Sequence, residues 1–247
     1  MALTDLEQQQ ADLAGVQLSD FRAANLFAWV ASRIPVGGRV LDVGCGAGGL
    51  VAYLLEAGFD ARGIDTSEAT VRAARGFLSS RGLDPGRINV GFTSDLIDAG
   101  EQTDTVVCMD CLEHVEDDQT LFDELVSLTR PGGTLIVTVP ALMSLYGERD
   151  ERIGHYRRYE RDELAALVEG APLSVHELRF WNVLGVGPTY ITQKVLGRNV
   201  DEGFRYGKPS LRKRMMRRLL HTWFRQVENR FAGPVGMSLL LHATRHE

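Results

Sequence analysis

The stretch that decides the fold runs Arg39-Val40-Leu41-Asp42-Val43-Gly44-Cys45-Gly46-Ala47-Gly48-Gly49. Its apolar residues, 40–43, predict a short buried strand, and glycines follow at once. Leucine and valine then recur at helical spacing as far as Gly58. The pattern therefore predicts strand, glycine-rich turn and helix. Such a turn lets the backbone approach a ligand closely, and the helix that follows offers free N–H groups to an anion.

Two cofactors fit this turn. The spacing Gly44-x-Gly46-x-x-Gly49, with Asp65 about 20 residues further on, matches the dinucleotide fingerprint. Asp42 favours a different ligand, because a carboxylate beside the loop would repel a pyrophosphate but would attract an ammonium group. S-adenosylmethionine (SAM) carries an ammonium group, a carboxylate for the backbone amides and a ribose for Asp65. SAM is the favoured cofactor, and an NAD(P)-dependent oxidoreductase is the alternative from another class.

The segment Leu41-Asp42-Val43-Gly44-Cys45-Gly46-Ala47-Gly48 resembles the first motif of the class I SAM-dependent methyltransferases. The resemblance implies a Rossmann-like sheet of seven strands whose last strand is antiparallel. It also implies SAM as cofactor, with S-adenosylhomocysteine as product. The cofactor-binding residues that it implies are Asp42, Gly44, Cys45, Gly46, Gly48, Asp65, Thr66, Asp95, Leu96, Met109, Asp110 and Arg22.

Strand and helix signals alternate along the chain, which predicts βαβ units and a mostly parallel α/β sheet with helices on both faces. Strands are expected at 40–43, 60–64, 88–92, 105–109, 134–139, 174–180 and 237–244. Helices are expected at 19–34, 67–80, 119–129 and 162–168, with Ser19 or Asp20 as the first cap. A tight turn is expected at Arg130-Pro131-Gly132-Gly133, and a long polar loop at 141–160.

The connection between the last two strands is too long for a hairpin, so it predicts inserted helices. We therefore expect a SAM-binding core at 1–181 and 232–247 and an inserted helical lid at 182–231. Residues 211–231 predict an amphipathic basic helix with one apolar stripe. Three roles remain open for it: a lid over the substrate, a contact between two copies of the chain, or peripheral contact with an anionic membrane.

Composition narrows the classes of function. The 247 residues carry a net charge of −6, while residues 198–230 hold ten basic and three acidic residues, or +7, which leaves −13 for the rest. Such an acidic body argues against a nucleic-acid partner. No run of about 20 apolar residues predicts a membrane span, and Met1–Asp12 has no signal-peptide pattern. Three cysteines fit a reducing, cytoplasmic setting. The chain is expected to be a monomer or a homodimer.

The segment Cys108-Met109-Asp110-Cys111-Leu112-Glu113-His114 follows the predicted fourth strand. It resembles the part of small-molecule methyltransferases that borders the transfer site. Asp110, Glu113 and His114 could hold a metal, as in ubiquinone-type O-methyltransferases, or could supply a general base, or could cap and brace the next helix. Bracing is favoured and no metal is expected. The two cysteines lack further ligands at suitable spacing, so a zinc site is not predicted.

A second polar run, Glu148 to Tyr159, resembles a segment ending Gly-His-x-Arg-Arg-Tyr in bacterial methyltransferases of sugar, lipid and natural-product pathways. We interpret it as a loop that closes the substrate pocket. Here His155 is the first choice for a base and His114 the second, while Tyr156 and Tyr159 shape the pocket. The predicted function is methyl transfer to a small molecule of natural-product or other secondary metabolism, by in-line displacement. Methylation of a sugar- or lipid-linked intermediate at a membrane surface is the alternative, and SAM binding without catalysis is also open.

Overall fold

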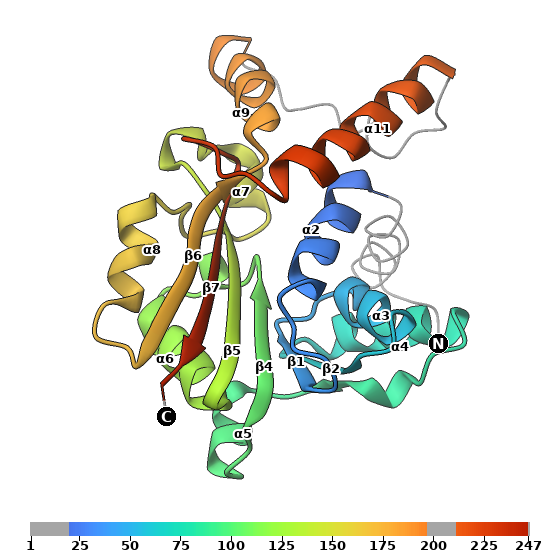
Figure 1. The fold of residues 1–247 in the computed structure, drawn as a ribbon, viewed down its shortest axis with the longest axis vertical. Coiled ribbons are helices and arrows are strands. Elements are labelled where there is room, and N and C mark those ends of the chain that lie inside the picture. Colours follow the sequence, from blue (N-terminus) through green and yellow to red (C-terminus); the bar gives the residue numbers. More distant parts are fainter. Residues whose placement is uncertain (1–19, 197–210, 247) are drawn as a thin grey trace.

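A computed structural model describes residues 20–196 and 211–246, which form a seven-stranded sheet in the order β3-β2-β1-β4-β5-β7-β6 (Figure 1). The first five strands are parallel, and β7 runs antiparallel to both β5 and β6. The predicted α/β fold and the antiparallel last strand are therefore confirmed. The strands are β1 (Arg39–Val43), β2 (Asp60–Asp65), β3 (Ile88–Val90), β4 (Thr103–Met109), β5 (Thr129–Pro140), β6 (Leu173–Trp181) and β7 (Ser238–Arg245).

The turn expected before the fifth strand lies within β5. Pairing with β4 jumps from Thr103↔Thr129 to Thr105↔Thr134, so the intervening residues bulge out of the ladder. Gly132 takes φ +71° there, a conformation that glycine adopts without steric cost. The predicted turn is therefore present, but it lies within β5 and does not precede that strand.

Helices cover both faces of the sheet (Figure 1). Polar side chains start several of them: Asp20 accepts a hydrogen bond from the N–H of Arg22 (2.9 Å), and Ser67 and Asp117 cap two more. One layer holds α2 (Phe21–Ala31), α3 (Gly49–Glu56) and α4 (Glu68–Ser80), and the other holds α5 (Thr93–Asp98), α6 (Asp118–Leu128) and α8 (Arg161–Val168).

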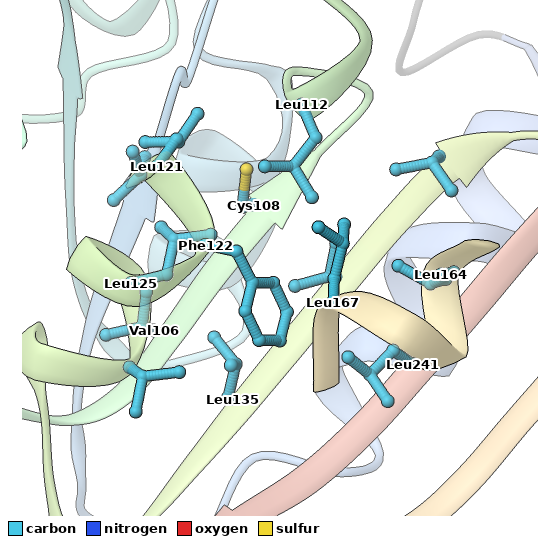
Figure 2. Packing of buried hydrophobic residues seen from close by; sticks show 14 of the residues in the cluster. Val106, Cys108, Leu112, Leu121, Phe122, Leu125, Leu135, Leu164, Leu167 and Leu241 are labelled. Atoms are coloured by element: carbon cyan, nitrogen blue, oxygen red, sulfur yellow. The ribbon is translucent and has the colours of Figure 1, made fainter. Parts of the chain in front are cut away.

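The larger core cluster lies between the sheet and the layer of α6 and α8. Phe122 of α6 is fully buried among aliphatic side chains of β4, β5 and α8 (Figure 2). Burying a phenyl ring of this kind stabilises a fold by about 3 kcal/mol, so this layer anchors the strands whose ends carry the site. A separate cluster beneath α2 and α3 includes Trp29, Trp181 and Phe224.

The polar segment predicted as a loop, 141–160, is more ordered than expected. It contains a short helix, α7 (Glu148–Arg152), after a 3₁₀ turn (Met143–Leu145). Asp150 and Arg158 are buried within it, although charged residues are normally solvated. The prediction of a loop failed here because a polar sequence carries no signal of burial when its charges are paired inside the protein.

The insertion before β7 is helical, as predicted. It contains α9 (Val183–Tyr190), a π-helical turn (Ile191–Val195), α11 (Leu211–Trp223) and a second π-helical turn (Phe224–Glu228). The expected helix 211–231 therefore changes hydrogen-bond pattern at Phe224. Residues 1–19, with Ser19 and the predicted polar N-terminus, and residues 197–210 lie outside the described residues. Within the described part, no helix is long and apolar enough to cross a membrane.

Buried Glu228 fastens the base of this insertion to the core. Its carboxylate accepts hydrogen bonds from the backbone N–H groups of Asn182 and Val183 (both 3.0 Å) and from the indole N–H of Trp223 (3.1 Å). Asn182 sits at φ +64°, at the sharp turn from β6 into α9. A buried carboxylate is tolerated because backbone donors replace its water shell. The insertion is therefore held at its root by polar contacts.

Candidate active site

The glycine-rich turn joins β1 to α3 in the predicted manner. Gly44, Gly46 and Gly48 all have positive φ, at 68°, 51° and 76°. A Cβ on Gly44 would lie 2.5 Å from the Sγ of Cys111, and one on Gly48 would lie 2.6 Å from Ile88. A Cβ on Gly46 would meet nothing within 4 Å. Two glycines are therefore required by packing as well as by φ, and the third leaves backbone open to a ligand.

Asp65 lies at the end of β2, directly against this turn. Its Oδ2 accepts a hydrogen bond from the N–H of Gly46 (3.0 Å), and its Oδ1 accepts one from the N–H of Ser67 (2.9 Å). Each oxygen keeps a second lone pair, so a pair of ribose hydroxyls can still be bound in a bidentate manner. The alternative role of Asp65 as a helix cap is not seen, because Ser67 caps α4.

Asp42 is buried at 3% exposure near the end of β1. Burial, followed by the nearby charge of Asp65, raises the pKa of Asp42 to about 8. A cation beside a buried carboxyl of this kind stabilises its ionised form strongly, because no water does so. The structure therefore places a group suited to an ammonium ion beside an open glycine turn.

The other predicted cofactor residues follow β1, β2 and β3, end β4 or begin α2, and they differ in exposure. Cys45 is buried, Met109 and Leu96 are half-buried, and Thr66 is exposed. Asp95 is exposed and accepts a hydrogen bond from the N–H of Phe92 (3.4 Å) at the start of α5. Half-buried Arg22 pairs with Asp20 at 3.6 Å. On the same helix, Asn25 is bound to His221 of the insertion (2.8 Å).

The turn after β4 holds Asp110 in an unusual conformation, with φ +49°. Its N–H donates to the carbonyl of Thr138 (2.8 Å), and its Oδ1 accepts from the hydroxyl of Thr138 (3.2 Å). Left-handed backbone is uncommon for a residue with a Cβ and gathers at functional sites. These two contacts to β5 hold the exposed Asp110 side chain at the carboxyl edge of the sheet.

The Cys108 and Cys111 thiols lie together behind this turn. A hydrogen bond with Cys111, and then burial, raises the pKa of Cys108 well above its usual range. A protonated thiol is a poor metal ligand and a poor nucleophile. Cys111 instead packs against Gly44, a contact between the two turns that the sequence did not show.

The 141–160 segment builds a buried chain of charges around Asp150. Its Oδ1 lies 3.0 Å from the Nδ1 of His155 and 2.9 Å from Nη2 of Arg158, and its Oδ2 accepts from the N–H of Gly147 (3.1 Å). Burial opposes ionisation of Asp150, yet the hydrogen bonds from His155 and Arg158 outweigh it and lower its pKa to about 2. An ionised Asp150 fixes the proton of His155 on Nδ1 and leaves Nε2 as the basic nitrogen.

The Nε2 of His155 faces Glu113, with 3.7 Å to Oε1. Glu113 is fully buried, and neither of its carboxylate oxygens has a hydrogen-bond partner among the described residues. Burial, and then the charge of Asp110, raises the pKa of Glu113 well above its usual range. Burial therefore disfavours the ionised form of Glu113, whose carboxyl lies beside Nε2 of His155.

His114 completes this group. Its ring contacts that of His155 edge-on, with 4.6 Å between centroids. Partial desolvation, and then the nearby His155, lowers the pKa of His114. One ligand atom each of Glu113, His114 and His155 lies within 4.8 Å of the others, close enough for a divalent cation. The predicted metal set had Asp110 in the place that His155 takes here.

Glu113 and His114 do not cap the next helix, because they lie in a 3₁₀ turn (Leu112–His114) and α6 is capped by Asp117. The turn does contact α6, so a bracing role stays a prediction. The backbone carbonyl of Glu113 instead accepts a hydrogen bond from the N–H of Tyr156 (2.8 Å). That contact ties the turn after β4 to the 141–160 segment.

The two tyrosines of that segment differ. Tyr156 is 55% exposed, and its role in shaping a pocket stays a prediction. Tyr159 is buried, and its hydroxyl donates to Asp118 (2.6 Å), so it belongs to the core instead of the pocket. Burial, and then the hydrogen bond to Asp118, raises the pKa of Tyr159. Asp150 and Arg158 were missed as site residues, although their spacing from His155 was visible in the sequence.

Comparison with known proteins identifies the family. A family model described as a methyltransferase domain matches residues 15–178. The chain belongs to this family. It is a SAM-dependent methyltransferase, and the oxidoreductase alternative is overturned. Relatives named ubiquinone biosynthesis O-methyltransferase are 34% identical over 106 residues in Stutzerimonas stutzeri and 34% identical over 169 residues in Xanthomonas campestris. These matches cover 42% and 61% of this methyltransferase, and 46% and 69% of the relatives.

Solved structures share the fold of this methyltransferase. A chain from the complex between the Haloferax volcanii Trm112 methyltransferase activator and a methyltransferase has a TM-score of 0.62 at 19% identity, covering all of both chains. The [4+2]-cyclase SpnF has a TM-score of 0.58 at 20% identity, covering 91% of this chain and 82% of its own. Because a cyclase shares the fold, the reaction has to be argued from the site.

Proposed function

We propose that this methyltransferase transfers the methyl group of SAM to a hydroxyl group of a small molecule, with His155 as the general base. The observation that carries the proposal is the buried Asp150–His155 pair at the end of β4 and β5, which orients a basic nitrogen. The relatives named O-methyltransferase favour an oxygen acceptor over nitrogen or carbon. A place in natural-product or other secondary metabolism stays a prediction.

Asp42, Gly46 and Asp65 would bind SAM through its ammonium, carboxylate and ribose groups. SAM supplies a methyl group on a positively charged sulfur. The acceptor oxygen attacks that carbon in line, the carbon–sulfur bond breaks, and its electron pair stays on the sulfur of S-adenosylhomocysteine. The hydroxyl proton passes to Nε2 of His155. Holding the acceptor in line and excluding water supply most of the rate.

Glu113 and Asp150 lie on either side of the His155 ring in this scheme. Once His155 has accepted the proton, the imidazolium lies between the carboxyl groups of Asp150 and Glu113. The two carboxyl groups therefore stabilise the charge that appears on His155 during transfer. Tyr156 and His114, on the exposed side of His155, would position the acceptor.

A divalent cation is the second candidate for this place, because Glu113, His114 and His155 converge. A cation would hold the acceptor oxygen and lower its pKa. We favour the base because the Nδ1 of His155 is already oriented by Asp150 and because burial disfavours the ionised Glu113 carboxyl that a cation would need. Dialysis against a chelator, followed by the assay with and without Mg²⁺, Mn²⁺ or Zn²⁺, separates the two. Unchanged turnover supports the base, and loss with recovery supports the cation.

The proposal is tested by incubating the protein with SAM and a panel of phenols, aliphatic alcohols, amines and indoles. We expect S-adenosylhomocysteine and an O-methylated product, identified by mass spectrometry and NMR. His155→Gln should bind S-adenosylhomocysteine normally and lose turnover. Methylation of nitrogen or carbon alone would overturn the oxygen acceptor. Tight binding of SAM without turnover of any acceptor would favour a protein that binds SAM but does not transfer its methyl group.

A further inference from the structure

The insertion carries an apolar face that the described residues, 20–196 and 211–246, leave uncovered. On α11 the exposed side chains include Met215 (61%), Met216, Leu219 (64%) and Trp223. At about 100° per residue these four positions share one side of the helix, and we call them the α11 apolar face. Apolar side chains that gather on one side of a helix mark an interaction site.

This face is distinct from the side by which α11 is attached. The attached side meets α2 through Phe224, whose ring lies 5.7 Å from that of Phe21, and through His221, which contacts Asn25. In Figure 1, α11 extends away from the body beyond this contact. The helix therefore does not lie over the sheet as a closed lid, and its apolar face does not pack against the core.

The basic residues of α11 indicate what kind of partner covers the α11 apolar face. The sequence of α11, Leu211–Trp223, contains five lysines or arginines and no acidic residue, in a chain of net charge −6. Arg214, Arg218 and, one turn beyond α11, Arg225 are all exposed along the flank of the apolar face. Two copies of this helix would repel each other, which disfavours a second copy as the occupant. A surface with negative charge outside and hydrocarbon beneath complements both features.

We propose that the α11 apolar face docks on an anionic lipid bilayer. The four apolar side chains would enter the boundary between headgroups and acyl chains, and the arginines would pair with anionic headgroups. The α9 helix and its π-helical turn, at the same end of the molecule as α11 (Figure 1), add exposed Leu184, Tyr190 and Ile191. The docked helix adds a membrane partner to the proposed function and does not depend on which atom is methylated.

Docking through α11 would orient the SAM-binding end of the protein relative to the bilayer. Its root contacts α2, and α2 belongs to the layer that packs on α3, the helix that begins at the glycine turn. The strands β4 and β5 end toward the same side of the molecule (Figure 1). A docked enzyme would therefore present the SAM-binding end toward the bilayer. An acceptor dissolved in the lipid could then reach the site without crossing bulk water.

The test is flotation of the full chain with vesicles that contain no acceptor, so its result is independent of the methyl-transfer reaction. One set is pure phosphatidylcholine, and the other contains about 30% phosphatidylglycerol, a composition chosen to give a strongly anionic surface. We expect binding to the anionic vesicles alone, and its loss as salt is raised. Equal binding to both sets, or binding to neither, would overturn the proposal.

Variants locate the surface. Leu219→Glu should weaken binding about tenfold or more, because a charge enters the apolar boundary. Val36→Glu, which places the same charge at an exposed valine outside the insertion, is the matched control and should bind like the wild type. Arg214→Gln with Arg218→Gln should cost about fivefold per arginine, whereas Arg81→Gln with Arg87→Gln should cost little. Thermal melting and binding of S-adenosylhomocysteine confirm that each variant is folded.

The same variants test the alternative that a second copy of the chain covers the α11 apolar face. If α11 joins two copies, light scattering will show a dimer that Leu219→Glu converts to a monomer, and neither vesicle set will float the protein. That pair of results would overturn docking on a membrane. Failure of the methyl-transfer assay with normal flotation would count against the proposed function and leave the docking intact.

Discussion

The residues proposed to bind the cofactor and those proposed to act on the acceptor are held in place by different interactions. In the cofactor half, Asp42 and Asp65 lie at the ends of adjacent strands and Gly46 lies in the turn beside them. Backbone conformation mainly determines the geometry of this half. In the acceptor half, Asp150 and His155 come from the 141–160 segment and Glu113 from a 3₁₀ turn, and contacts between buried polar groups set the geometry. The first half follows from local sequence and sheet topology. The second depends on contacts between segments far apart in the chain.

The largest effect that would test this division is the loss of His155. His155→Ala should lower kcat by about 10²- to 10⁴-fold, the usual contribution of a general base. The affinity for S-adenosylhomocysteine should stay within about twofold of wild type, because the cofactor half does not depend on this ring. Steady-state kinetics and calorimetric titration provide both values.

His176→Ala is the matched control, because His176 is an exposed histidine on β6 whose ring contacts Thr244. It should leave kcat unchanged. A drop in cofactor affinity for His155→Ala, with little change in kcat, would show that the two halves are not separate and that His155 is not the base.

The next effect belongs to the cofactor half. Asp65→Ala should raise the Kd for SAM about 100-fold, because it removes two charge-assisted hydrogen bonds to the ribose and frees the N–H of Gly46. Turnover at saturating SAM should change much less. Asp162→Ala, at an exposed acid of α8, serves as the control. Equal Kd values for Asp65→Ala and wild type in calorimetry would remove the ribose role.

The glycine turn and the place of Asp65 after the next strand could be predicted because each signal is local. Positive φ selects glycine at positions 44, 46 and 48, and topology brings Asp65 to the loop. Close contacts across the turn could not be predicted. The approach of Gly44 to Cys111 depends on how two separate turns pack, and no periodicity in either segment records it.

The acceptor half could be predicted only in its residue types. A histidine and two tyrosines in a polar run indicated function, and His155 does lie in a buried cluster. Its partners were hidden, because Asp150 and Arg158 look like solvated charges until their pairing is seen. Glu113 was assigned to bracing a helix, and it meets His155 only after β4 and the 141–160 segment pack together.

Asp150 should show this pairing as a dependence of stability on pH. Its pKa is about 2 in the folded protein and 3.8 in the unfolded chain, so the folded state favours the ionised form. This contribution, about 2 kcal/mol, is present above pH 3.8 and is lost as the pH falls toward 2. Urea unfolding at pH 7 should show Asp150→Asn to be less stable, and the difference should shrink near pH 3.

Glu151→Gln changes an exposed neighbour on α7 and should have little effect at either pH. A constant difference between wild type and Asp150→Asn across this range would mean that the charge of Asp150 does not stabilise the fold. The histidine would then lack the anionic partner on which its role as a base depends.

The smallest effect tests whether the cofactor half also uses charge. With a pKa of about 8, Asp42 is mostly protonated at neutral pH, and the ammonium of SAM favours its ionised form. Binding should therefore release a proton, and affinity should rise about 20-fold from pH 6 to 7.5. Titrations at pH 7 in buffers of different ionisation enthalpy should show close to one proton released by wild type and none by Asp42→Asn. The same release from Asp42→Asn would place the proton on another group, and the cofactor half would then be built by backbone conformation and Asp65 alone.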